Sequence, residues 1–366
     1  MLSIFCAPSR YVQGRDATHS LGQEMAKLGL TGPVFVVAGK SAKRHLEAVW
    51  HQTFKKAEIE YEIFEFAGEC SREEIDRAKK AAQNFAAKAV VGAGGGKVLD
   101  TSRAVAAELD LPAINCPTAA SSDAPCSALS VVYSEDGAVE RYLFYKRNPD
   151  LVLVDTTVIA KAPPRLLTAG MGDALATWFE ARTVMEARKA NQVGGGTTIS
   201  AAALAQLCYE TLLEDGLAAL NAVRSQSVTP ALERLVEANT LLSGLGFESG
   251  GLAVAHSVHN GLTIMPETHA YMHGEKVAFG LIVQLVLEGK GKDVLREVLE
   301  FCWSVGLPTN LTAIGLANLN RTQIMQIASR ATAPGETAHN EPFVVTAEAV
   351  ADAIAAADLL GSRKLI

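Results

Sequence analysis

Half of the chain's histidines lie close together in the sequence. Four of the eight, His256, His259, His269 and His273, fall between residues 256 and 273. The first two are three residues apart in an apolar segment that begins at Gly251, so they would share one face of a helix. A buried imidazole needs a polar partner, and a metal ion is one such partner. The segment therefore indicates a metal site, with backbone-bonded core histidines as the plainer alternative.

Asp173 is a carboxylate that could complete this site. It lies in the run Ala169-Gly-Met-Gly-Asp173-Ala-Leu-Ala-Thr177, at what we expect to be the glycine-flanked start of a helix. Two imidazoles and one carboxylate leave a coordination position open, which is typical of catalytic metal sites. The scattered cysteines do not form the closed thiolate sets of structural zinc, and no HExxH motif occurs. The alternative is that Asp173 only caps its helix.

A glycine-rich loop has the composition of a phosphate site. The apolar run Ala89-Val-Val91 leads into Gly92-Ala-Gly94-Gly95-Gly96-Lys97 and then into a helical pattern. Between a strand and a helix N-terminus, glycines let backbone amides approach a phosphate, and a lysine adds a cation. The spacing matches neither Walker A nor G-x-G-x-x-G, because Lys97 stands where the latter has its third glycine. The alternative is a sharp turn with a solvated lysine.

A polar segment follows the next expected strand, Ala113–Cys116. In parallel α/β sheets ligands bind beyond the carboxyl ends of the strands, so this segment would lie near the glycine loop. Asp123 could accept a hydrogen bond from a substrate hydroxyl. The hydroxyl side chains that could bond a cofactor are Thr118, Ser121, Ser122 and Ser127. A capped turn, in which these side chains bond their own backbone, fits the sequence equally well.

The elements that would position these groups fall into two halves. In the first half, short β-branched runs alternate with alanine-rich helical stretches, which is typical of a parallel sheet covered on both faces. After Pro163 and Pro164 only helical patterns remain. We therefore predict an α/β domain at residues 1–162 and an all-helical domain at residues 163–366.

The individual elements expected from these patterns can be stated as ranges. The strands are Val34–Val37, Tyr61–Phe66, Ala89–Val91, Ala113–Cys116 and Leu151–Val154. The helices are Ser20–Leu28, Arg72–Ala87, Val98–Leu109, Arg165–Ala190, Thr197–Val223, Thr229–Leu245, Gly274–Glu288 and Val294–Val305.

The composition excludes several classes of protein. Of the 366 residues, 49% are hydrophobic and 20% charged, and the formal net charge is -7. This apolar fraction excludes a mostly disordered chain, and the interrupted apolar runs exclude a membrane-spanning one. Without a basic stripe, nucleic acid is not expected as the main partner. Six scattered cysteines without a C-x-x-C pair, and an N-terminus unlike a secretory signal, predict a reduced protein in the cytoplasm.

As a set, these motifs resemble the iron-containing (group III) alcohol dehydrogenases over nearly the whole chain, and within them the members that oxidise glycerol. The likeness rests on Gly94-Gly-Gly-Lys-Val-Leu-Asp-Thr101, Asp123-Ala-Pro-Cys-Ser127-Ala-Leu129, Gly172-Asp173-Ala-Leu-Ala-Thr177, Gly246-Phe-Glu-Ser-Gly-Gly-Leu, Ala255-His-Ser-Val-His-Asn-Gly-Leu and His273-Gly-Glu. The resemblance implies a Rossmann-like N-terminal domain and a helical C-terminal domain, as in dehydroquinate synthase. The cleft between the two domains would hold the dinucleotide and the metal.

The resemblance also implies roles for individual residues. Asp173, His256 and His273 would bind the metal, Zn²⁺ or Fe²⁺, and together with Asp123 they form the expected catalytic and substrate-binding set. The residues that would contact the dinucleotide are Gly39, Gly94, Gly95, Gly96, Lys97, Thr118, Ser121, Ser127, Leu129 and Tyr133. His259 and His269 match no ligand position of the family.

Two positions refine this assignment. Many family members have a fourth metal ligand, a histidine four residues after the aspartate, whereas this chain has Thr177 there. A site with three ligands leaves room for two vicinal hydroxyls. The family usually has an aspartate after the strand Val34–Val37 that binds the adenosine ribose, whereas this chain has Gly39, followed by a basic loop, Lys40–Arg44. We expect NAD as the cofactor, with NADP as the alternative, because loss of the carboxylate removes repulsion against a 2′-phosphate.

The expected activity is a metal-dependent hydride transfer between glycerol, or a related vicinal diol, and a nicotinamide cofactor, giving dihydroxyacetone. The first alternative is an NADPH-dependent reductase of 2-oxo acids or other carbonyls in the same family. Non-redox metal-and-NAD chemistry, as in dehydroquinate synthase, is the second, and a nucleotide-binding module with histidines in its core is the third. The family further implies a homo-oligomer, an octamer, with a small polyol as substrate and neither nucleic acid nor membrane as partner.

Overall fold

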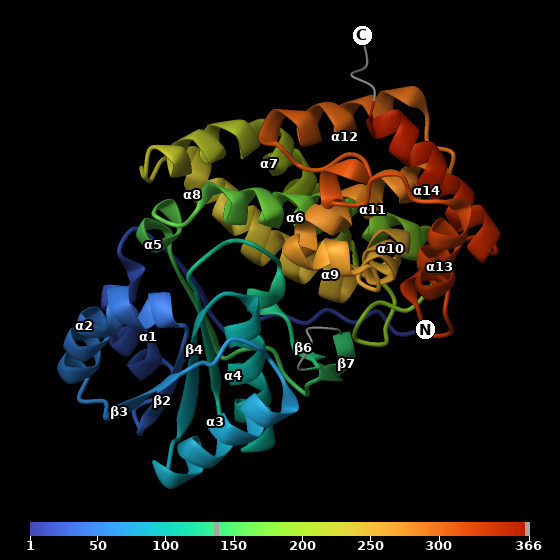
Figure 1. Ribbon diagram of the computed structural model, residues 1–366. Coiled ribbons are helices and arrows are strands. Elements are labelled where there is room, and N and C mark those ends of the chain that lie inside the picture. The colour runs from blue at the N-terminus through green and yellow to red at the C-terminus, as the bar shows by residue number, and fades with distance from the viewer. Residues whose placement is uncertain (135–138, 363–366) are drawn as a thin grey trace. The chain divides into compact units, whose positions relative to one another are not determined.

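The computed structural model describes residues 1–134 and 139–362, which form two compact units (Figure 1). The first unit, which we call the α/β unit, comprises residues 7–164 and 221–241. The second, the helical unit, comprises residues 1–6, residues 165–220 and the chain from Leu242 onward. The predicted fold class, a parallel-sheet α/β half followed by a helical half, is confirmed.

A six-stranded parallel sheet forms the centre of the α/β unit. Its strands lie in the order β1 (Tyr11–Gly14), β8 (Leu151–Asp155), β5 (Ala113–Pro117), β4 (Ala89–Gly94), β2 (Val34–Ala38) and β3 (Tyr61–Glu65). All neighbouring pairs in this sheet are parallel. The chain runs from β2 outward to β3 and returns past β2 to β4, so the winding direction reverses between β2 and β4. In open parallel sheets, that reversal is where the carboxyl ends of the strands bind ligands.

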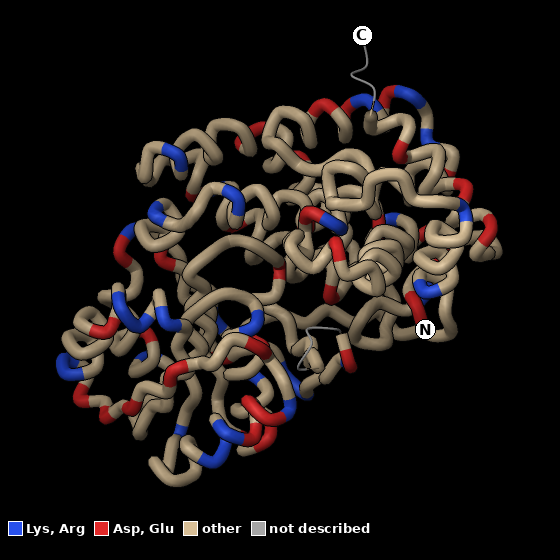
Figure 2. Tube along the Cα trace, in the orientation of Figure 1, with Lys and Arg blue, Asp and Glu red and all other residues tan. Residues whose placement is uncertain are grey.

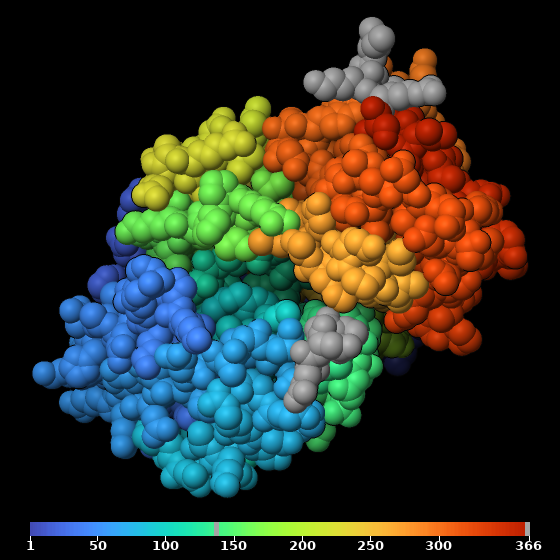
Figure 3. Space-filling view, in the orientation of Figure 1, coloured from blue at the N-terminus to red at the C-terminus, as the bar shows by residue number. Residues whose placement is uncertain are grey.

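Alternate residues of the buried strands support two separate cores. On one face, Val34 and Val36 pack with Trp50 of α2 (Lys40–Lys56) and with residues of α1 (Leu21–Lys27). On the other face, Phe35 and Val37 pack with residues of α3 (Arg72–Asn84) and α4 (Gly96–Glu108). This alternation follows from the two-residue period of a strand and explains why β2 is apolar throughout. In Figure 3, blue and teal atoms from the first part of the chain make up much of the visible surface of this unit.

Several elements differ from those predicted by sequence. The basic segment Lys40–Arg44 is the first turn of α2, not a loop, because Ala42, Leu46, Trp50 and Phe54 recur at helical spacing and bury one face of α2. The strand β1 and the hairpin β6 (Leu129–Tyr133) and β7 (Val139–Phe144) were not predicted. These strands are only partly buried, so they lack a continuous apolar run.

The helical unit is built from long helices and short connecting turns. Residues 199–220 of α7 (Ile199–Arg224) belong to this unit and its last four residues to the α/β unit, as do α5 (Thr156–Ala160) and α8 (Pro230–Glu237). The remaining helices have the bounds α6 (Pro164–Glu186), α9 (Ser243–Gly250), α10 (Val254–Leu262), α11 (His273–Leu287), α12 (Lys292–Val305), α13 (Arg321–Ala331) and α14 (Ala347–Gly361), with a π-turn η3 (Ala238–Leu242) and short 3₁₀ turns η1 (Ala17–Ser20), η2 (Ala124–Cys126), η4 (Pro266–Ala270), η5 (Thr312–Ile314) and η6 (Thr337–Asn340). None of the described helices has both the length and the apolar character needed to cross a membrane.

Glycines allow three helices of the helical unit to pack backbone against backbone. A Cβ atom at Gly172 of α6 would overlap the carbonyl oxygen of Gly274, and one at Gly274 of α11 would overlap that of Ala169. In the same way, a Cβ atom at Gly280 of α11 would overlap the carbonyl oxygen of Ala255 in α10. Side chains larger than hydrogen would push these helices apart, so the glycines hold α6, α10 and α11 close together.

Candidate metal centre and active site

Asp173, His256 and His273 lie side by side in the helical unit, although each comes from a different helix. The Oδ1 atom of Asp173 is 3.0 Å from Nε2 of His273 and 3.4 Å from Nε2 of His256. One potential ligand atom from each of the three residues lies within 4.8 Å of the others. Two imidazole nitrogens and a carboxylate oxygen therefore converge on one point, a donor set that suits Zn²⁺ or Fe²⁺.

Close helix packing places these three side chains. Asp173 lies well inside α6 and not at its start, so the prediction of a helix start was wrong and the side chain is no N-cap. His273 is the first residue of α11, and His256 lies near the start of α10. Gly172 and Gly274, the glycines that let α6 and α11 touch, each neighbour one of the candidate ligands. Each glycine therefore helps to position the neighbouring candidate ligand, because it allows α6 and α11 to come into close contact.

Burial and charge act against each other at this centre. Asp173 is fully buried, and although burial alone would raise its pKa, the nearby His273 and hydrogen bonds from both histidines lower the pKa overall. Burial alone would lower the pKa of His256, but the carboxylates of Glu180 and Asp173 raise it well above its usual value. The side chain of His273 is 40% exposed, which leaves one side of the centre open.

Glu180 is a second carboxylate at this centre that sequence reasoning missed. It lies two turns after Asp173 on the same face of α6 and is fully buried. Its Oε2 is 2.6 Å from Nδ1 of His256, and its Oε1 accepts hydrogen bonds from the backbone N–H groups of Ala253 and His256. A carboxylate can only accept, so Nδ1 of His256 carries a proton toward Glu180, and Nε2, on the Asp173 side, is the nitrogen that could bind a metal. An acid seven residues after Asp173 in an apolar helix was the available signal.

The residues present fit a divalent cation. The two buried carboxylates, Asp173 and Glu180, together carry the charge that balances one divalent ion. The hydroxyl of Thr177, where other family members have a histidine ligand, is 2.8 Å from Ser243 Oγ and is fully buried. Three side chains therefore supply the donor set, and Thr177 supplies none.

The predicted phosphate loop lies at the carboxyl edge of the sheet in the α/β unit. Gly39 after β2 donates its N–H to Ala93, and Thr118 after β5 donates its N–H to Gly94, so three neighbouring strands meet at this edge. A Cβ atom at Gly95 would meet nothing within 4 Å, and one at Gly96 would meet only Ser122 Oγ, at 3.7 Å. The glycines thus leave open space at the start of α4, where backbone amides can receive a phosphate.

The predicted cofactor contacts near this loop differ in how far they are buried. Lys97 is not simply solvated: its Nζ is 2.5 Å from Glu69 Oε2 and 4.9 Å from the ring centre of Tyr133. Tyr133 ends β6 and Leu129 begins it, and both are partly buried. By contrast, Ser127 is fully buried and its hydroxyl donates to the Ala124 carbonyl, as the capped-turn alternative expected.

Three further predicted residues differ in their exposure. Asp123 is 8% exposed and directly precedes η2, and Ser121 is half-buried. His269 is exposed, and its Nε2 is 3.0 Å from the carbonyl oxygen of Thr263. Their binding roles, and those of the other candidate site residues, stay predictions.

The distribution of charge agrees with a small-molecule site. In the tube view, positive and negative segments of the α/β unit are interspersed (Figure 2). Of the basic residues in the first turn of α2, Lys43 pairs with Glu65 Oε2 at 3.4 Å, while Lys40 and Arg44 are exposed. Two cations therefore remain at the surface beside Gly39.

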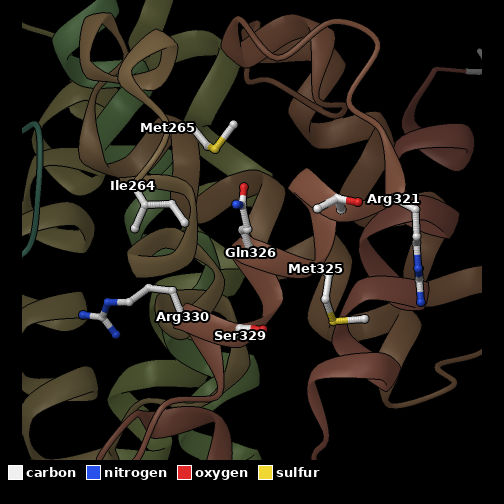
Figure 4. A pocket seen from close by; sticks show the side chains of 8 residues that line it. Ile264, Met265, Arg321, Met325, Gln326, Ser329 and Arg330 are labelled. Carbon is white, nitrogen blue, oxygen red and sulfur yellow. The ribbon is translucent and has the colours of Figure 1, made fainter.

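A surface groove of about 830 Å³ lies elsewhere in the helical unit (Figure 4). Its walls come from α13 and from the turn before η4. The lining residues are Ile264, Met265, Arg321, Thr322, Met325, Gln326, Ser329 and Arg330. Asp173, His256 and His273 are not among them, so this groove is distinct from the candidate metal centre.

Comparison with known proteins agrees with the motifs described above. The family model of iron-containing alcohol dehydrogenases matches residues 8–156. The chain is 50% identical to the glycerol dehydrogenase of Thermotoga maritima, over 100% of this chain and 99% of that protein. It is 48% identical to a glycolaldehyde reductase of Halobacterium salinarum, over 99% of both chains.

A solved structure is also similar over nearly the whole chain. The crystal structure of a probable glycerol dehydrogenase from Sinorhizobium meliloti has a TM-score of 0.92 and 40% identity, covering 98% of this chain and 99% of that one. Sequence and fold therefore agree along the whole chain. The predicted resemblance is confirmed: the chain belongs to the iron-containing alcohol dehydrogenase family.

Proposed function

We propose that this chain oxidises glycerol to dihydroxyacetone by transferring a hydride to a nicotinamide cofactor. The observation that carries the proposal is the convergence of Asp173, His256 and His273 in a member of the iron-containing alcohol dehydrogenase family. Glycerol dehydrogenases from several bacteria are 46–50% identical to it over at least 98% of its length.

The metal centre would work through the three converging side chains. A divalent metal bound there would act as a Lewis acid that lowers the pKa of a substrate hydroxyl. Asp173 would hold it through Oδ1, and His256 and His273 through Nε2. Glu180 would keep His256 in the tautomer that ligation requires. Since Thr177 offers no fourth ligand, room remains for both hydroxyls of a vicinal diol.

The α/β unit would bind the dinucleotide. The open start of α4 at Gly95 and Gly96 supports a pyrophosphate there, because the helix dipole and backbone amides favour an anion. Lys97 would add a positive charge. Thr118 and Tyr133 would contact other parts of the cofactor, and Asp123 would orient the diol; this last role rests on the family resemblance alone.

Gly39 is the position at which we expect the choice between NAD and NADP to be made. Its φ of -66° suits any residue, and the nearest atom to an added Cβ is 3.6 Å away, so aspartate fits there. Gly39→Asp is expected to lower kcat/KM for NADP at least about tenfold through charge repulsion, equivalent to ~1.4 kcal/mol, while kcat/KM for NAD is retained or raised. Initial rates with both cofactors measure this.

Gly39→Ala is the matched control, because it adds the Cβ without the charge. It should change the two values of kcat/KM by the same factor. Equal losses for NAD and NADP in Gly39→Asp would show that the adenosine ribose does not lie beside this residue.

The proposed activity is tested by initial-rate kinetics with four substrates: glycerol, 1,2-propanediol, glycolaldehyde and a 2-oxo acid. Each is assayed with NAD(H) and NADP(H), before and after chelation and after readdition of Zn²⁺ or Fe²⁺. We expect diol oxidation with NAD that chelation abolishes and metal restores. A 2-oxo acid reduced faster than any diol is oxidised would contradict the proposal.

Reduction of glycolaldehyde is a second candidate function, because a relative with that activity is 48% identical. It would use the same site in the opposite direction, from carbonyl to alcohol. A kcat/KM for glycolaldehyde with NAD(P)H well above that for glycerol oxidation would favour it. The relatives named above act on glycerol or glycolaldehyde, so a 2-oxo acid is not favoured.

We further propose a homo-octamer in the cytoplasm that contains zinc. The six cysteines are free thiols, which supports a reducing compartment. Light scattering after gel filtration tests the octamer, and elemental analysis of the purified protein distinguishes zinc from iron.

A further inference from the structure

His259, which has no ligand role in the family, lies directly against the candidate ligand His273. Nε2 of His259 is 3.0 Å from Nδ1 of His273, and the two ring centres are 4.2 Å apart. On its other side, Nδ1 of His259 is 3.1 Å from Oδ1 of Asn260. Both His259 and Asn260 are buried, with 6% and 8% exposure. His259 is thus held between a candidate ligand and an amide.

The contacts continue from Asn260 to the edge of the helical unit. Nδ2 of Asn260 donates to Oε2 of Glu336 at 3.0 Å. Oε1 of Glu336 accepts from Arg330, one of the residues that line the groove in Figure 4. A continuous hydrogen-bonded chain therefore links His273 at the metal centre to Glu336, whose side chain is 11% exposed.

Only one arrangement of protons satisfies this chain. A carboxylate accepts and cannot donate, so the amide of Asn260 must turn its NH₂ group toward Glu336 and its oxygen toward His259. Since that oxygen also only accepts, the proton of His259 must lie on Nδ1, which leaves Nε2 as an acceptor. His273 then donates from Nδ1–H, so its Nε2, which lies 3.0 Å from Asp173 Oδ1, is the nitrogen that would bind a metal.

We propose that Glu336, Asn260 and His259 are positioning residues that fix His273 in the tautomer able to bind a metal through Nε2. The inference rests on the metal site of the proposed function. The two ligand histidines would reach the same protonation pattern by different routes. Glu180 bonds His256 directly, whereas Glu336 acts on His273 through two intermediate side chains. Partners of this kind typically change metal affinity by 10- to 100-fold.

The central test compares two substitutions at His259. His259→Leu removes the acceptor for His273 Nδ1–H, and we expect the dissociation constant for Zn²⁺ to rise by about 10- to 100-fold. In His259→Gln the amide oxygen lies near the place of Nε2 and still accepts, so the constant is expected to stay within about threefold of wild type. Competition with a chromophoric chelator, without substrate or cofactor, measures both.

A control and a remote variant complete the design. His269→Gln changes an exposed histidine of the same segment and should leave Zn²⁺ affinity unchanged. Glu336→Ala releases the Asn260 amide, and we expect the dissociation constant to rise by about 3- to 10-fold, less than for His259→Leu. Circular dichroism establishes that each variant is folded. If His259→Leu does not fold, Glu336→Ala decides the outcome in its place.

The possible results separate this proposal from the one on which it rests. Wild-type Zn²⁺ affinity in folded His259→Leu, or in Glu336→Ala should His259→Leu not fold, overturns the positioning role. Equal losses in His259→Leu and His259→Gln also overturn it, because they indicate a role in packing alone. An Asp173→Asn variant that binds Zn²⁺ like wild type would instead show that the metal site is wrong.

Discussion

Asp173→Asn is expected to lose bound metal and to lower kcat/KM for glycerol by at least about 100-fold. Asp173 is the one anionic group in the converging donor set, and it is fully buried between two histidines. Asparagine keeps the size of the side chain but not its charge, so the fold should persist. Loss of a group that only supports a ligand costs about 10- to 100-fold, and loss of the ligand itself should cost at least the upper end of that range. Elemental analysis and initial rates in excess Zn²⁺ measure the two effects.

Asp352→Asn provides a matched control for this variant. Asp352 lies in the same unit and pairs with Arg321, but its side chain is 74% exposed. The same change of aspartate to asparagine should leave metal content and activity unchanged there, because exposed pairs contribute about 1 kcal/mol or less. Stoichiometric metal together with normal activity in Asp173→Asn would show that this carboxylate is not a ligand.

The family resemblance implied the three converging residues, whereas residue types and spacing alone indicated only a metal site among the clustered histidines, with Asp173 as a possible further ligand. The supporting groups were not predicted, because their roles depend on how helices cross. Glu180 and His256 are 76 positions apart, and nothing in either segment indicates that α6 and α10 meet there. The same holds for His259, which the sequence placed on one helix face with His256. That placement is compatible with a shared ligand set, yet the crossing of α10 with α11 directs His259 to Nδ1 of His273.

Strands were predictable where both faces are buried, as in β2 and β8, because burial on both faces demands a continuous apolar run. The partly exposed strand β7 carries no such run. Helix α2 was not predicted, because basic residues on its exposed face obscure its apolar pattern in the sequence. Segment 221–241 has helical patterns like those around it, but it packs with the α/β unit. The residue pattern of a segment indicates that it forms a helix, whereas contacts with residues distant in the sequence determine which unit the helix packs against.

Glu341→Gln is expected to stabilise the protein at alkaline pH and to have little effect near pH 4. Glu341 is 2% exposed, and within the described residues neither of its carboxyl oxygens has a hydrogen-bond partner. Burial, and then the negative charges of Glu288 and Glu180, raise its pKa from 4.5 to about 8. By contrast, Glu288 accepts hydrogen bonds from Thr183 and Gln284 and pairs with Lys290. Glu341, which lacks such partners among the described residues, therefore keeps its proton to a higher pH than an ordinary glutamate.

The direction of the pH effect follows from where that proton is bound. Between pH 4.5 and about 8 the folded chain holds a proton on Glu341 that the unfolded chain has lost, so the free energy of unfolding falls as pH rises through this window. Above about pH 8 the buried carboxylate is charged and the full penalty remains. Glutamine is neutral at every pH, so the advantage of the variant should grow across the window to several kcal/mol, at about 1.4 kcal/mol per pKa unit.

Urea unfolding at pH 4, 7 and 9 measures the difference between wild type and Glu341→Gln. Glu300→Gln, on the exposed face of α12, is the control and should show no such growth with pH. A difference that stays constant with pH would mean that Glu341 ionises equally readily in the folded and unfolded chain. The expected growth would instead indicate that Glu341 holds its proton more tightly in the folded chain than in the unfolded chain.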